Sequence, residues 1–177
     1  MSLLASMREA LRDHTPDRVA EALRRAGVDA PRASHGRPEA TLTGASGSSV
    51  GVIEIKGSPI AWINVRKGKA PLDSGLADLA WFLEYGVPDA RMPAGLPSIA
   101  LRFATGRWSG AEHGTGLAYA LTDDMYETPD TVRSDAIDVR AHPARSCWVI
   151  STDYHTDFVK ERWQLYELIA RRLLKTR

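Results

Sequence analysis

This chain has almost no cysteine, no long apolar run and no excess of charge of either sign. Its only cysteine, Cys147, excludes an internal disulfide, and the apolar residues that follow it predict a buried position inside a strand. No apolar run approaches the roughly 20 residues of a membrane-spanning helix. Residues 1–12 alternate charges with leucine, whereas a signal peptide needs an uninterrupted apolar stretch. We therefore expect a cytoplasmic protein that does not bind a membrane.

The balance of charge restricts the expected partners. The 177 residues include 23 Lys+Arg and 22 Asp+Glu, which gives a formal net charge of +1. This balance argues against a basic surface over the whole chain, which a nucleic-acid binder would need, but it permits a local patch. A chain of this length buries about two-thirds of its unfolded surface in one core. We expect a single domain over residues 1–177.

Four segments have the apolar spacing of helices. The second begins at Thr15-Pro16-Asp17, which combines a capping hydroxyl, a first-turn proline and an acid that favours the helix dipole, and Gly27 ends it. The fourth has one apolar and one charged half. Arg162 falls within its apolar half, where it either extends past the helix end or pairs with a buried carboxylate. The expected helices span residues 3–11, 15–26, 73–86 and 157–174.

Short alternating or β-branched runs separated by turn residues predict the strands. Residues 28–38 have no period and predict a loop. Because turns join the first strands directly, we expect an α+β fold in which a mostly antiparallel sheet of about six or seven strands carries its helices on one face. The amphipathic C-terminal helix packs on that sheet. The expected strands span residues 40–43, 49–56, 60–66, 98–104, 117–121, 136–140 and 147–151.

The order of these expected elements resembles the Tir-chaperone-like fold of secretion chaperones, which runs α-βββ-α-ββ-α. This chain has two further strands, and it lacks the acidity of such chaperones. The resemblance therefore concerns the arrangement of helices and strands alone.

Pro38-Glu39 and Glu54-Ile55-Lys56 have the spacing of a metal-dependent nuclease site. In this respect the chain resembles the PD-(D/E)XK family, although that family usually has aspartate in place of Glu39 and has a mixed sheet. The resemblance implies that Glu39 and Glu54 bind Mg²⁺, that Lys56 activates the attacking water, and that the basic turn at residues 66–69 lies near the phosphate backbone. Strand alternation places Glu54 and Lys56 on one face. The alternative is that these charged residues lie on a strand face exposed to solvent and have no catalytic role.

The glycine-rich segment from Thr105 to Gly116 is a candidate recognition loop. Its four glycines permit backbone conformations with positive φ, and no phosphate-loop ending or helix pattern follows it. A hairpin loop with its tryptophan folded onto the core is the alternative. The side chains suited to recognition are Arg107, Trp108, Glu112 and His113.

No complete catalytic constellation is visible, and Trp81 lies off the apolar stripe of the helix expected over 73–86. We therefore expect a non-catalytic binding module, either chaperone-like or toxin-neutralising, whose partner is a protein or a second copy of this chain. Whether the chain is an enzyme stays open. The segment from Asp153 to Asp157 has the spacing of metal ligands, but helix capping also explains it. No metal or cofactor is expected, and Mg²⁺ and nucleic acid belong only to the nuclease alternative.

Overall fold

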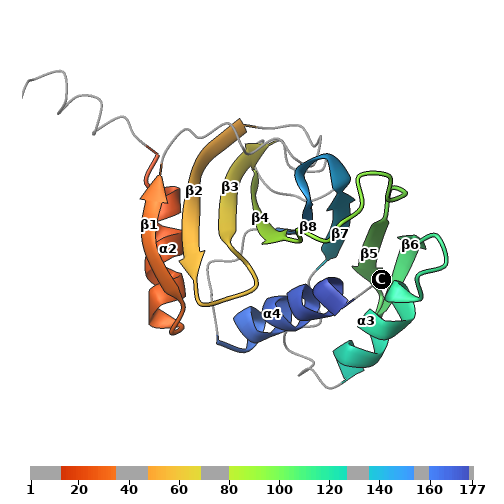
Figure 1. The fold of residues 1–177 in the computed structure, drawn as a ribbon. Helices are drawn as coiled ribbons and strands as arrows, with labels where there is room; N and C mark the ends of the chain where they lie inside the picture. Colours follow the sequence, from red (N-terminus) through yellow and green to blue (C-terminus); the bar gives the residue numbers. More distant parts are fainter. Residues whose placement is uncertain (1–12, 35–47, 69–79, 127–135, 154–159, 176–177) are drawn as a thin grey trace, which may run out of the picture.

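The computed structural model describes residues 13–34, 48–68, 80–126, 136–153 and 160–175 (Figure 1). The sheet contains eight strands in the order β1-β2-β3-β4-β8-β7-β5-β6. Every neighbouring pair is antiparallel, which confirms the α+β fold, with slightly more strands than expected. The elements are α2 Thr15–Arg25, β1 Asp29–Ser34, β2 Ser48–Lys56, β3 Trp62–Gly68, β4 Ala80–Pro88, β5 Ala100–Ala104, β6 Arg107–Ala111, α3 Leu117–Tyr126, β7 Ile137–His142, a 3-10 turn Pro143–Arg145, β8 Cys147–Asp153 and α4 Lys160–Lys175.

One face of the sheet forms the core. Ile53, Ile63, Tyr85 and Ile150 are successive cross-strand partners, so they point to the same side, and all four are buried. The aromatic ring of Tyr85 lies 4.6 Å from the ring of Tyr166 in α4, centroid to centroid. Helix α4 therefore covers this face, as the amphipathic pattern predicts (Figure 1).

Helix α2 lies on the same face, beside the β1 edge of the sheet. It contacts β1 and β2, and β2 buries Ile53 and Ile55 while exposing Glu54 and Lys56 on the opposite side. The helix must therefore pack against the isoleucines. Described helices α2 and α4 thus share one side of the sheet, and their buried residues belong to one continuous core.

The boundaries of α2 follow local chemistry. Gly27, at φ 86°, donates its N–H to the Arg24 carbonyl, and Val28 donates to the Leu23 carbonyl, which is the expected glycine end of a helix. Its start differs from the prediction. Thr15 is the first helical residue and donates its N–H to Asp13 Oδ1 at 2.9 Å, so it is not the cap.

The expected strands over 49–56, 60–66, 98–104, 136–140 and 147–151 are confirmed to within a few residues, and Cys147 is buried in β8. Within the described part of the C-terminal segment, α4 confirms the last helix. The helix expected over 3–11 and the strand over 40–43 lie outside the described residues. So do residues 154–159, which hold most of the Asp153–Asp157 motif. No helix in the described ranges is long and apolar enough to cross a membrane.

Three of the predicted loop, helix and strand segments were wrong. Residues 29–34 form an edge strand rather than a loop, because an edge strand hydrogen-bonds on one side only and tolerates Pro31. Residues 80–88 form β4, although the helix pattern covered 73–86, and residues 69–79 are not described. A central strand buried on both faces has no clean alternation, so its apolar spacing resembled that of a helix.

The third error concerns residues 117–121, which begin helix α3 rather than forming a strand. Leu117, Leu121 and Met125 are buried at helical spacing. The predicted strand covered only residues 117–121, and a run of five residues is too short to distinguish the period of a helix from that of a strand. With β4 and α3 reassigned, the element order departs from that of the Tir-chaperone-like fold.

Candidate functional site

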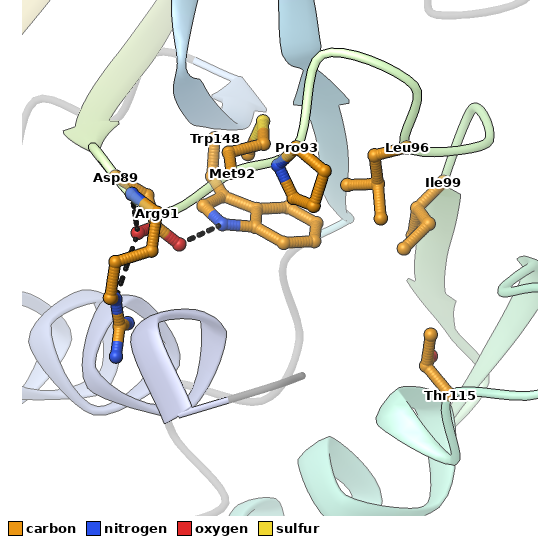
Figure 2. Close-up of a pocket in the computed structure, with 8 residues that line it drawn as sticks. All are labelled: Asp89, Arg91, Met92, Pro93, Leu96, Ile99, Thr115 and Trp148. Carbon is orange, nitrogen blue, oxygen red and sulfur yellow. Dashed lines mark hydrogen bonds and ion pairs between the residues drawn. The ribbon is translucent and has the colours of Figure 1, made fainter.

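A pocket of about 340 Å³ lies between the β4–β5 connection, the start of β8 and the segment that leads into α3 (Figure 2). Its size is at the lower end of the range of about 300–1,000 Å³ that is common for ligand sites. The lining is mostly apolar with a few polar groups, which is also usual for such sites. The residues of this Trp148 pocket are Asp89, Arg91, Met92, Pro93, Leu96, Ile99, Thr115 and Trp148.

The indole of Trp148 forms one wall of the pocket. Figure 2 shows the ring beside Met92 and Pro93, with Leu96 and Ile99 beyond its six-membered end and Thr115 across the gap. Trp148 is only 3% exposed, so its ring is held by the core rather than free to swing out. The pocket is therefore largely formed before any ligand enters.

Hydrogen bonds hold the β4–β5 connection in place. Asp89 N–H donates to the Ser146 carbonyl at 2.8 Å, which joins the connection to the turn before β8. Met92 N–H donates to the Asp89 carbonyl at 3.0 Å, and Leu96 N–H donates to the Pro93 carbonyl at 3.0 Å. These turns fix the backbone of the apolar lining, and proline adds stiffness by restricting φ.

The polar end of the pocket is an acid surrounded by donors. Asp89 Oδ2 accepts from Trp148 Nε1 at 3.4 Å, and Oδ1 accepts from the backbone N and side-chain Nε of Arg91 at 3.1 and 3.3 Å. Arg91 also donates Nη2 to the Leu174 carbonyl near the end of α4. Asp89 is 7% exposed and Arg91 is 61% exposed. The charge available to a ligand at this end is therefore the positive one.

The other end of the pocket is built by the glycine-rich segment. Thr115 Oγ1 accepts from Leu117 N at 3.3 Å, and Glu112 Oε2 accepts from Ala118 N at 2.7 Å, so both cap α3. His113 Nε2 lies 3.0 Å from the Ser98 carbonyl, just before Ile99 of the lining. The expectation that no helix follows this segment was wrong. Two of the predicted recognition residues, Glu112 and His113, position this wall of the pocket.

The first half of the glycine-rich segment is a hairpin. Thr105 and Gly106 both have positive φ, at 53° and 80°, as a two-residue turn between antiparallel strands requires. All four glycines have positive φ, as predicted. Gly110 is the most constrained, because a Cβ there would lie 2.2 Å from the Ala100 carbonyl oxygen.

The remaining predicted binding residues lie away from the pocket lining. Trp108 is 5% exposed, and its ring packs 5.5 Å from that of Phe103, so the alternative interpretation of a tryptophan folded onto the core is the one found. Arg107 is exposed at the start of β6. Trp81 lies in β4 opposite Lys67 rather than in a helix, and its side chain lies outside the described residues.

The residues of the nuclease hypothesis are partly placed. Glu54 and Lys56 are exposed on one face of β2, and Ile53 and Ile55 are buried on the other, as alternation predicts. Glu39 lies outside the described residues, so the convergence of the three side chains is untested. In the ranges that the structure describes, the sheet is wholly antiparallel rather than mixed, and no group of three His, Cys, Asp or Glu residues is placed to hold a metal.

A buried polar network on the opposite side of β3 and β4 was not predicted. Arg66 Nη1 donates to Glu84 Oε1 at 2.5 Å, Asn64 Nδ2 donates to Glu84 Oε2 at 2.8 Å, and Ser49 Oγ donates to Asn64 Oδ1 at 2.7 Å. Arg66 is 4% exposed and Glu84 is fully buried. Arg66, the first residue of the basic turn expected at residues 66–69, therefore lies in β3 with a buried side chain, because strand alternation places it on the same side as Asn64.

Sequence reasoning also missed the pocket itself. Residues 87–97 separate the helix expected over 73–86 from the strand expected over 98–104, and their one signal was a pair of opposite charges, Asp89 and Arg91, beside Met92. Trp148 was interpreted as a strand residue, which it is, but nothing in its neighbours indicated a cavity. No protein-family model, curated protein or solved structure matches this chain.

Proposed function

We propose that this chain is a small cytoplasmic, non-catalytic binding module that takes an apolar side chain of a partner protein into the Trp148 pocket. The observation that carries the proposal is a preformed, mostly apolar concavity with one exposed charge at its end. Such pockets supply the buried anchor around which protein interfaces gain most of their affinity. A chaperone-like or toxin-neutralising role fits this chemistry, and a second copy of the chain is an alternative partner.

A peptide library displayed on phage tests the proposal. Leu96→Trp places a large ring within the pocket, and Ala104→Trp adds the same ring at an exposed position at the far end of β5. We expect selected peptides to share a large apolar residue, to bind the parent and Ala104→Trp equally, and to lose binding to Leu96→Trp. Selected peptides that bind Leu96→Trp as tightly as the parent would contradict the proposal. A library from which no binding peptide is selected would also contradict it.

A Mg²⁺-dependent nuclease is the second candidate, and the observation in its favour is that Glu54 and Lys56 are exposed on the same face of β2. Under this proposal Glu39 and Glu54 hold the metal, and Lys56 activates the water. DNA and RNA are incubated with Mg²⁺ or Mn²⁺ and the parent, Lys56→Ala or Lys160→Ala. Cleavage lost only with Lys56→Ala would establish the nuclease, and a parent that does not cleave would exclude it.

A further inference from the structure

The carboxylate at the end of the Trp148 pocket is already satisfied. Three donors reach Asp89, two from Arg91 and one from the Trp148 indole, and the side chain is only 7% exposed. A cationic ligand would have to displace Arg91 to reach this acid. An anionic ligand meets no such competitor, because the Arg91 guanidinium is mostly exposed and has more N–H donors than its two contacts use.

Two further cations are sequence neighbours of residues that hydrogen-bond to this end of the pocket. Arg91 donates to the Leu174 carbonyl, and the next residue, Lys175, is exposed. Asp89 N–H donates to the Ser146 carbonyl, and the preceding residue, Arg145, is exposed. A ligand with a negative group beside an apolar group therefore matches the pocket in both charge and polarity.

We propose that the Trp148 pocket binds the C-terminal residue of a partner polypeptide, with its apolar side chain against Trp148 and its terminal carboxylate on Arg91. This inference rests on the proposed binding function and specifies its ligand. A C-terminal residue carries both groups on one Cα, which suits a pocket of about 340 Å³. In an extended internal segment, an acidic neighbour of the apolar anchor points to the opposite side, so its carboxylate would point away from Arg91.

Fluorescence polarisation with labelled octapeptides tests the inference. One peptide ends in phenylalanine with a free carboxylate, the second has the same sequence with a C-terminal carboxamide, and the third carries the phenylalanine internally beside a glutamate. We expect the free acid to bind most tightly and the carboxamide about tenfold more weakly, since a hydrogen bond to a charged group is lost. This comparison uses the parent chain, so it does not depend on a variant that folds.

Variants then assign the effect to Arg91. Arg91→Gln should reduce binding of the free acid to the level of the carboxamide and leave the carboxamide unchanged. Arg18→Gln removes an exposed arginine from α2 and should change neither. Circular dichroism and thermal unfolding check that Arg91→Gln is folded.

The outcomes separate this inference from the proposed function. If the acid and carboxamide bind equally and Leu96→Trp abolishes both, the pocket binds apolar anchors but does not read a C-terminus. If the internal peptide binds as tightly as the free acid, the carboxylate comes from a side chain and the inference is wrong. If octanoate displaces the peptides and the three peptides bind equally, the pocket is a small-molecule site and the inference is wrong. If no peptide binds, the inference and the proposed function both fail.

Discussion

The centre of the sheet and the end of the Trp148 pocket each pair an arginine with a carboxylate, but they expose them differently. Arg66 and Glu84 are 4% and 0% exposed, and Asn64 also donates a hydrogen bond to the acid. Arg91 and Asp89 are 61% and 7% exposed. The first pair has no face open to a ligand. The second buries its acid and presents its cation, so the same chemistry stabilises one region and leaves the other able to bind.

The largest expected effect is at the sheet centre. Glu84→Gln removes the buried carboxylate charge that Arg66 Nη1 contacts, so we expect a loss of about 3–5 kcal/mol in the free energy of unfolding. Urea denaturation followed by circular dichroism measures it. Adding Arg66→Met to Glu84→Gln removes the buried guanidinium as well and should recover part of the loss. A single variant that loses less than about 1 kcal/mol would show that the pair is not desolvated as described.

A smaller effect is expected at the pocket. Asp89→Asn keeps an acceptor for Trp148 but removes the charge beside Arg91, so we expect about 1 kcal/mol of destabilisation. Peptides with a free C-terminal carboxylate should then bind more tightly, because Arg91 no longer shares its charge with Asp89. Urea denaturation and fluorescence polarisation measure the two quantities. Weaker binding to the Asn variant would contradict the division of roles within this pair.

The pH dependence of stability tests His142, a half-buried histidine at the end of β7. Burial lowers the pKa of His142, and the negative charge of Glu84 acts in the opposite direction. As the pH is lowered, His142 takes up its proton at a higher pH in the unfolded chain than in the folded chain. The free energy of unfolding should therefore fall as the pH falls below the ordinary histidine pKa of 6.5. His142→Gln should reduce this dependence between about pH 7 and 5. A parent and variant with identical pH profiles of urea unfolding would contradict the prediction.

The smallest effect completes the comparison with an exposed pair. Arg102 Nη1 lies 3.6 Å from Asp138 Oδ2, and these side chains are 60% and 32% exposed. Solvent and salt screen such a pair, so Arg102→Gln should change the free energy of unfolding by less than about 0.5 kcal/mol. The same urea titration measures it. A loss as large as that of Asp89→Asn would mean that exposure does not rank these three pairs.

The parts of the fold that the sequence predicted are those with one buried and one solvated side. Helix α4 has an apolar half that packs on Tyr85, and β2 alternates Ile53 and Ile55 with Glu54 and Lys56. In both, the period of the apolar residues directly reports which side faces the core. The binding residues were less predictable. Glu112 and His113 were two of the candidate recognition residues, and their hydrogen-bond contacts are to α3 and Ser98.

Local sequence thus determined the antiparallel α+β fold, the end of α2 at Gly27 and the positive φ angles of the glycine-rich segment, because backbone sterics and amphipathic periods act over a few residues. Only the tertiary structure decided that residues 80–88 are a central strand, since burial on both faces erases the period that would have identified it. It also decided the pocket. Asp89, Thr115 and Trp148 are far apart in the sequence, and only the pairing of β4 with β8 and the packing of α3 place their side chains around one cavity.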